Sequence, residues 1–212
     1  ETQYVNNSSA INGISLIDSL HAFCVGDSGR SWYTSNGGTH VPLVGDGWTE
    51  DTTEFTVDLN DCWFFDTLSG YAVGDSGTII KTIDGGTNWT KVTSNVFADL
   101  YKIEFPVPDT GYISADSGKV LRTLNGGSTW TVIDIGNTNS LYDIHTKGKD
   151  TVWICGANSE VRVSYNAGNT WNSKNTNVSS YIGDVYGIYF VDESLGYLVG
   201  SKNTYYYICK TV

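Results

Sequence analysis

The chain is poor in basic residues: 12 lysines and arginines stand against 23 aspartates and glutamates in 212 residues, giving a net charge of −11. Because phosphate contacts rely on Lys and Arg, this balance argues against nucleic acid and against an anionic membrane surface as partners. No run of about 20 apolar residues is present, so we expect no membrane insertion. A secretory signal peptide is also missing, and we expect a processed, mature chain.

Cysteine and histidine are too sparse and scattered for a metal site. The four cysteines show no CxxC spacing, only three histidines accompany them, and no EF-hand spacing occurs. We therefore expect no metal and no cofactor. Two alternatives stay open for the cysteines: disulfides Cys24–Cys62 and Cys155–Cys209 formed in an oxidising compartment, or four buried thiols that replace apolar strand residues.

Charged residues make up only 17% of the chain, whereas it contains 24 glycines, 14 tyrosines and 7 tryptophans. This composition is typical of a turn-rich β protein with much aromatic surface for packing between sheets. We expect almost no helix.

A short phrase recurs along the chain. It reads GTIIKTIDGGTNWT at residues 77–90, GKVLRTLNGGSTWT at 118–131 and, in degraded form, SEVRVSYNAGNTWN at 159–172. Repeats spaced by about 40 residues are typical of solenoids and propellers. Around each phrase the sequence predicts four short strands separated by turn signals, which is the layout of one propeller blade.

The repeat unit occurs five times. One apolar position of the predicted first strand marks every copy: Ile14, Cys62, Ile103, Ile144 and Ile188. We therefore expect one all-β domain, a five-bladed β-propeller of four-stranded blades with boundaries at 10–58, 59–98, 99–139, 140–181 and 182–212. The last copy ends before a fourth strand, and residues 1–9 continue the register of that strand. The N-terminal segment is thus expected to complete blade five as its outer strand and to close the ring.

The glycine-rich part of the repeat resembles an Asp-box, the Ser/Thr-x-Asp-x-Gly-x-x-Trp turn of sialidase-type (BNR) propellers. In such a turn the Asp or Asn accepts hydrogen bonds from the turn amides, glycine supplies a positive φ, and the tryptophan anchors the turn to the sheet. We expect a structural role, on the rim away from the ligand face. The residues concerned are Asn36 in a weaker copy without the tryptophan, Asp84 with Trp89, Asn125 with Trp130, and Asn166 with Trp171.

The wider cadence, GYAVG…G…I.KT.DGG..W, resembles the photosystem II assembly and stability factor family and the secreted bacterial proteins that share its repeat. The resemblance covers almost the whole chain. It implies a protein-binding propeller that acts during assembly, through a basic patch on a larger ring. This chain differs in having five units and three arginines, Arg30, Arg122 and Arg162.

Two enzyme classes share the Asp-box. Sialidases need an arginine triad on the inner strands, whereas all three arginines here map to third strands, so this activity is not expected. Asp-box glucanases use two carboxylates across a cleft, and this chain has many acids, but the known enzymes are larger double propellers. No catalytic residue is assigned.

The predicted ligand face is the one where the turn after strand two meets the connection to the next blade. We place there the acids of the Asp-Ser-Gly turns and three tyrosines near the starts of inner strands: Asp27, Asp75, Asp116, Tyr101, Tyr142 and Tyr186. The alternatives are that the acids only bond their own turns and that the tyrosines only pack between blades.

One connection is longer than its counterparts. We assign the extra residues to a loop at 42–58 on the ligand face, where Trp48 stands among Asp46 and Glu50. Trp48 would stack on a sugar ring or anchor a protein partner. The alternative is a longer hairpin that packs its own tryptophan.

These observations favour a non-enzymatic, extracytoplasmic binding or scaffold propeller. It would recognise a protein partner at a cell, virion or filament surface as part of a larger assembly, and would be secreted, periplasmic or surface-bound. The alternative is a lectin-like, glycan-binding module. A glycoside hydrolase of the Asp-box type is the less favoured alternative.

Overall fold

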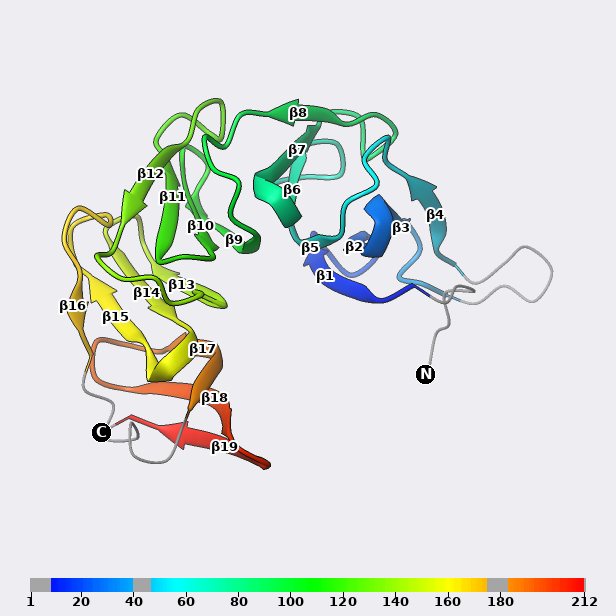
Figure 1. The fold of residues 1–212 in the computed structure, drawn as a ribbon. Coiled ribbons are helices and arrows are strands. Elements are labelled where there is room, and N and C mark those ends of the chain that lie inside the picture. Colours follow the sequence, from blue (N-terminus) through cyan, green and yellow to red (C-terminus); the bar gives the residue numbers. More distant parts are fainter. Residues whose placement is uncertain (1–8, 40–46, 175–182, 212) are drawn as a thin grey trace. The chain divides into compact units, whose positions relative to one another are not determined.

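The fold is all-β, as the sequence predicts. The computed structural model describes residues 9–39, 47–174 and 183–211. In these ranges the strands form five antiparallel sheets, four of them four-stranded and one three-stranded, each built from strands consecutive in the chain (Figure 1). The strands are β1 (Ile11–Leu16), β2 (Ala22–Gly26), β3 (Arg30–Thr34), β4 (Thr49–Thr52), β5 (Leu59–Phe64), β6 (Gly70–Gly74), β7 (Thr78–Thr82), β8 (Thr90–Val92), β9 (Leu100–Val107), β10 (Thr110–Ala115), β11 (Lys119–Thr123), β12 (Thr131–Asp134), β13 (Asp143–Lys147), β14 (Thr151–Cys155), β15 (Val161–Ser164), β16 (Asn172–Ser173), β17 (Asp184–Phe190), β18 (Gly196–Lys202) and β19 (Tyr205–Lys210).

The chain divides into two units, Glu1–Thr93 and Ser94–Val212. The first unit holds sheets β1–β4 and β5–β8, and the second holds β9–β12, β13–β16 and β17–β19. In the first unit β1 packs beside β5, and in the second β13 packs against both β9 and β17. Within each unit, first strands therefore lie next to first strands, as the inner strands of a propeller do.

Five sheets fit the five expected blades, and the register of the first strands agrees with the repeat alignment. Cys62 pairs with Ala72, Ile103 with Ile113, Ile144 with Ile154, Ile188 with Leu198 and Ile14 with Cys24, always across the first two strands of a sheet. The expected outer strand at 1–9 lies outside the described residues except for Ser9, and the blade boundaries stay predictions.

Neighbouring sheets of one unit bury aromatic and aliphatic side chains between them. Phe23 of β2 stacks on Phe64 of β5 with ring centroids 3.7 Å apart, and Trp153 of β14 stacks on Phe190 of β17 at 4.9 Å. Burying one such side chain contributes about 1.5–3 kcal/mol. The sheets are therefore held face to face by hydrophobic contact, which fixes the loops at their edges.

The Asp-Ser-Gly turns after the second strands need glycine for space. In the turns at 27–29 and 116–118, Ser28 and Ser117 have φ of 57° and the following glycines have φ of 70° and 65°. A Cβ on Gly29 would lie 1.5 Å from the carbonyl oxygen of Phe55, and one on Gly118 would lie 2.1 Å from that of Asn137. The connection to the next sheet runs directly against each turn, so the two loops form one rigid edge.

None of the four cysteines is joined in a disulfide, so the alternative of disulfides Cys24–Cys62 and Cys155–Cys209 is not met. Phe23 and Val25 face the cluster that contains Cys62, so Cys24, which stands between them, points to the opposite face of β2. Burial raises the pKa of Cys24 to about 11. The alternative of thiols that act as apolar strand residues describes the three buried ones, and Cys209 is only partly buried.

Candidate functional site

Three tyrosines form a continuous row across the three sheets of the second unit. Tyr101 lies on β9, Tyr142 directly precedes β13, and Tyr186 lies on β17. The ring centroids of Tyr101 and Tyr142 are 5.6 Å apart at 72°, and those of Tyr142 and Tyr186 are 5.5 Å apart at 39°. The repeat places them at one position of consecutive first strands, so the packing of β13 between β9 and β17 brings the rings together. We call these three residues the tyrosine row.

The tyrosine row is partly open to solvent and held by hydroxyl contacts. Tyr186 is 48% exposed, and Tyr101 and Tyr142 are half-buried. Ser201 Oγ donates a hydrogen bond to the hydroxyl of Tyr186 at 3.1 Å. Ser140 stands beside the other two and donates to Asp116 Oδ1 at 2.6 Å. An aromatic surface of this kind offers ring faces to a ligand without a large loss of side-chain entropy.

Carboxylates border the tyrosine row. Burial, followed by the negative charges of Asp116 and Asp99, raises the pKa of Tyr101. Burial, followed by the charge of Asp184, raises the pKa of Tyr142. The phenols are therefore kept protonated and act as hydrogen-bonding groups.

The corresponding acids of the first unit hold the starts of their first strands. Asp27 accepts hydrogen bonds from the backbone N–H of Ala10 at 3.2 Å and from Asn12 Nδ2 at 3.0 Å. Asp75 accepts one from Asn60 Nδ2, also at 3.0 Å. These contacts join each turn to the start of the first strand of its sheet, whereas the alternative drawn from the sequence had the acids bonding only their own turns. Asn12 and Asn60 occupy the repeat position of the row tyrosines, so the row belongs to the second unit.

The Asp-box residues form the hairpin between the third and fourth strands. In the box at 82–89, Asp84 Oδ1 accepts hydrogen bonds from Thr82 Oγ1 and from the N–H of Asn88, both at 2.9 Å. Asn125 and Asn166 make the same two contacts in their own hairpins, and Asn36 makes the one with Thr34. Trp89 packs edge-on against Phe64 and Trp130 against Phe105, while Trp171 packs against the apolar cluster of its sheet. This network stabilises the hairpins.

The structure corrects the position of the extended loop at 42–58. Residues 49–52 are β4, which pairs with β3 from Arg30↔Thr52 to Tyr33↔Thr49. The connection after β4 covers only 53–58, whereas the residues between β3 and β4 are 35–48. The corresponding hairpins of the other boxes are shorter: 83–89, 124–130 and 165–171. Counted along the chain, the extra residues therefore stand between β3 and β4, before the connection that was expected to hold them.

Trp48 stands directly before β4, just as Trp89 stands before β8 and Trp130 before β12. It is thus the tryptophan that the first box lacked in the sequence alignment, displaced along the chain by the extra residues. Glu50 forms an ion pair with Arg30 across β3 and β4. Asp46 lies outside the described residues. Trp48 and Glu50 belong to the first unit, and the tyrosine row belongs to the second.

A second polar cluster on the inner strands was missed by the sequence analysis. Glu104 of β9 accepts a hydrogen bond from Thr146 Oγ1 at 2.8 Å, and its Oε1 lies 3.9 Å from His145 Nδ1. Burial raises the pKa of Glu104 to about 7 and lowers that of His145, so both shifts favour the neutral forms. His145 Nε2 bonds the carbonyl oxygen of Phe190 at 3.1 Å. The available signal was a Glu and a His at interior-facing positions of adjacent first strands.

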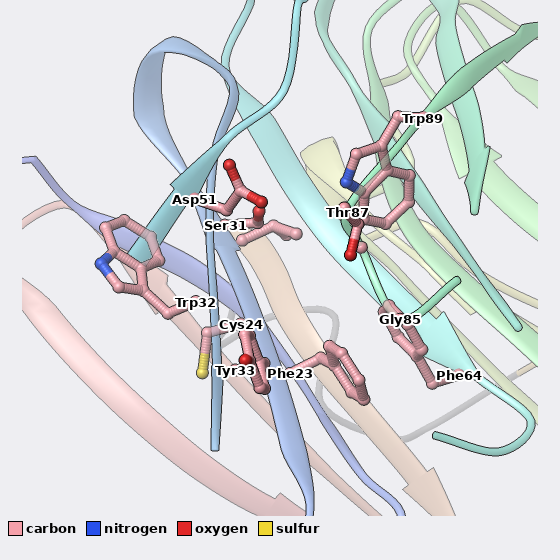
Figure 2. A pocket seen from close by; sticks show the side chains of 12 residues that line it. Phe23, Cys24, Ser31, Trp32, Tyr33, Asp51, Phe64, Gly85, Thr87 and Trp89 are labelled. Atoms are coloured by element: carbon pink, nitrogen blue, oxygen red, sulfur yellow. The ribbon is translucent and has the colours of Figure 1, made fainter. Parts of the chain in front are cut away.

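A pocket in the first unit lies between β2–β4 and the Asp-box turn of the next sheet. Figure 2 shows Ser31 and Asp51 from one sheet and Thr87 and Trp89 from the other around this pocket. Its volume is about 20 Å³, which is enough for a water molecule but too small for a sugar or a peptide side chain. The indole N–H of Trp89 is buried there without a hydrogen-bond partner. We regard the pocket as a packing feature.

The described ranges contain no group of three or more metal-ligating side chains. They also contain no helix long and apolar enough to cross a membrane.

The blade-like sheets and the Asp-box hairpins together define a β-propeller built from BNR-type repeats. The sequence matches the family described as "Photosynthesis system II assembly factor YCF48" over residues 43–139 and 129–207. The chain belongs to this family. No curated protein sequence matches it.

Solved structures agree on the fold at low sequence identity. A structure described as YCF48 bound to D1 peptide is 16% identical, with a TM-score of 0.51 over 100% of this chain and 95% of that one. YCF48 from Cyanidioschyzon merolae is 13% identical, with a TM-score of 0.50 over 99% and 98%. An ancestral GH74 enzyme has a TM-score of 0.75 at 15% identity, covering 99% of this chain but only 31% of the enzyme. At these identities the likeness shows the fold alone.

Proposed function

We propose that this protein is a non-enzymatic propeller that recognises a protein partner through the tyrosine row. The observation that carries the proposal is the contact of three partly exposed rings across consecutive first strands, with centroids 5.6 and 5.5 Å apart. Aromatic residues on a rigid scaffold are enriched in protein-binding sites because they contribute much contact area and lose little conformational entropy. Membership of a family of assembly factors supports a protein partner, and one YCF48 structure carries a peptide.

We further propose that the ring closes through the N-terminal segment. Sheet β17–β19 has three strands among the described residues, whereas each of the other sheets has four. Residues 1–9 match the missing fourth strand in repeat register. Deleting residues 1–8 should then increase hydrogen exchange at the amides of β19 that do not face β18. Unchanged exchange in β19 would contradict this closure.

The place of action that we propose is outside the cytoplasm, at a cell, virion or filament surface and within a larger assembly. The support is the resemblance of the repeat to that of secreted proteins. Fractionation of the source organism, with detection by an antibody, tests the location directly. Recovery in the cytoplasmic fraction would contradict it.

A lectin-like function is the alternative, because sugar rings also stack on tyrosine faces. A glycoside hydrolase is less well supported, because it requires two opposed carboxylic acids at about 5–10 Å. Glu104 has a raised pKa, but nearby Asp143 accepts the backbone N–H groups of Ile144 and Ile188, at 2.9 and 2.8 Å. Those contacts fix Asp143 as part of the strand pairing.

The test is affinity capture from an extract of the source, followed by mass spectrometry of bound proteins and glycans. Tyr142→Ala removes the central ring of the tyrosine row. Tyr165→Ala is the matched control, because Tyr165 is 45% exposed on the Asp-box hairpin of the same unit. We expect a stoichiometric protein that Tyr142→Ala loses and Tyr165→Ala retains. Glycan without protein would favour the lectin, and loss in both variants would contradict a site at the row.

A further inference from the structure

Carboxylates lie around the tyrosine row. Three of them, Asp99, Asp116 and Asp184, are among the groups that raise the pKa of Tyr101 and Tyr142. They come from three different loops or strands, and the repeat brings them to the same edge as the rings. The row is therefore an aromatic surface bordered by carboxylates, on a chain of net charge −11.

Two cations of the second unit are paired with acids. Lys119 forms an ion pair with Asp134 at 2.5 Å, and Arg162 pairs with Glu160 at 2.8 Å. The charge of Lys102 acts on Glu104, whose pKa it lowers.

The bordering carboxylates are held in place. Asp116 Oδ1 accepts the hydroxyl of Ser140 at 2.6 Å, and Asp184 Oδ1 accepts the backbone N–H of Asn158 at 3.0 Å. Each carboxylate thus keeps a defined position. Because the rings and the charges are both fixed before binding, a ligand that matches them loses little free energy to reorganisation of the site.

Tyrosine rings bordered by carboxylates attract positively charged groups. An ammonium or guanidinium group over a tyrosine face gains about 0.5–2 kcal/mol, and neighbouring carboxylates add charge-assisted hydrogen bonds. The centroid spacings of 5.6 and 5.5 Å are close to the ~6.5–7 Å between alternate side chains of an extended chain. Alternate residues of one extended segment could therefore each meet a ring.

We propose that the tyrosine row, with Asp99, Asp116 and Asp184, docks an extended, lysine- and arginine-bearing segment of the partner protein. This inference rests on the proposed protein-binding function and names the chemistry of the partner. It also assigns the surface a charge opposite to the basic patch that the family resemblance implied.

The experiment is isothermal titration of the full chain with two synthetic peptides of the same length, one with alternating Lys or Arg and Gly or Ser, the other with Glu in place of every basic residue. We expect binding of the basic peptide only, weakened several-fold by added salt. Tyr142→Ala should weaken it about tenfold and Tyr142→Phe little, because the phenyl ring remains.

Asp116→Asn keeps an oxygen acceptor for Ser140 and should weaken the basic peptide several-fold. Asp150→Asn makes the same charge change in the turn at the opposite end of β13 and is the matched control, for which we expect no change. Unfolding curves of all variants verify that they are folded. Equal binding of the Glu peptide, no binding of the basic peptide, or equal weakening by Asp150→Asn would each overturn the inference. A captured partner insensitive to the basic peptide would overturn only this inference and leave the proposed function intact.

Discussion

Glu104 makes the stability of the second unit depend on pH. Burial raises its pKa to about 7 in the folded chain, above the ordinary value of 4.5. Between these values the folded state holds a proton that the unfolded state has released. The contribution of Glu104 to stability therefore falls as the pH rises from 4.5 to 7, by up to about 1.4 kcal/mol per pH unit.

Glu104→Gln should remove this dependence. The amide oxygen can still accept the hydrogen bond of Thr146, and no charge has to be buried. We expect the variant to gain stability over the native chain on going from about pH 5 to about pH 8, as measured by urea unfolding. Burial also lowers the pKa of His145, with the opposite dependence on pH, but Glu104 does not contribute to that shift, so the difference between the two proteins isolates Glu104.

The exposed Glu193 provides the control for that measurement. Glu193→Gln removes the same charge from the surface and should leave the pH dependence of unfolding unchanged. If Glu104→Gln were no more stabilising at about pH 8 than at about pH 5, the buried, neutral state of Glu104 would be wrong.

At this scale the sequence singled out the three tyrosines but not the glutamate. Tyr101, Tyr142 and Tyr186 share one repeat position, so their contact follows once first strands lie side by side. The state of Glu104 depends on how deeply β9 and β13 bury it, and that depth is set by packing. The depth of burial of Glu104 cannot be predicted from the sequence of a single strand.

The Asp-box hairpin is an element held by one hydroxyl. In the third sheet, Thr123 Oγ1 accepts the N–H groups of Asn125 at 3.3 Å and Gly127 at 2.9 Å, and donates to Asn125 Oδ1 at 2.9 Å. Thr123 is 1% exposed. Thr123→Val keeps the shape but leaves buried N–H groups without an acceptor, so we expect a loss of about 1–3 kcal/mol in the free energy of unfolding.

Thr129→Val is the control in the same hairpin. Thr129 is exposed, and its hydroxyl accepts a hydrogen bond from the side-chain amide of Asn125. Its replacement should change the free energy of unfolding by no more than about 0.5 kcal/mol. Similar losses for both variants in urea unfolding would show that the buried hydroxyl has no special role.

The first hairpin provides a prediction about a whole element. Removing residues 40–46 from the chain would leave Thr-Ser-Asn-Gly-Gly-Thr-Gly-Trp, an Asp-box in which Trp48 takes the place of Trp89. Because the deletion restores the length of the other hairpins, we expect the chain to fold with an unchanged or higher melting temperature. Circular dichroism and thermal unfolding measure the outcome, and a chain unable to fold would show that these residues are required.

The misplaced loop shows a limit to predicting the position of an element from a repeat alignment. The first box has no tryptophan at residue 41, so the sequence alone favoured a box ending there and a long loop after it. The pairing of β3 with β4 shows that residues 49–52 form a strand. Arg30 stands opposite Thr52 in this pairing and forms an ion pair with Glu50. This pairing joins residues that are far apart in the sequence, so it could not be predicted from the position of the displaced tryptophan.

For the whole molecule, repetition predicted the number and order of the sheets, and it also predicts how the ring would close. Phe23 stacks on Phe64 and Trp153 on Phe190, always from a second strand to the first strand of the next sheet. In the last sheet, Tyr197 of β18 occupies the second-strand position and is 44% exposed. In the first sheet, Leu16 of β1 occupies the first-strand position and is 74% exposed. Each therefore has a face to which the repeat assigns a neighbour.

The proposed closure predicts that a charge at Leu16 is costly. If Leu16 covers Tyr197 in a closed ring, Leu16→Lys loses apolar contact and forces an ammonium against an aromatic and aliphatic surface, which should lower the free energy of unfolding by about 2–3 kcal/mol. Leu20→Lys is the control, because Leu20 is 50% exposed in the turn between β1 and β2, away from that position. Urea unfolding of both variants decides the matter. Since surface substitutions change stability by only about 0.5 kcal/mol, equally small effects at the two leucines would mean that these faces do not close the ring.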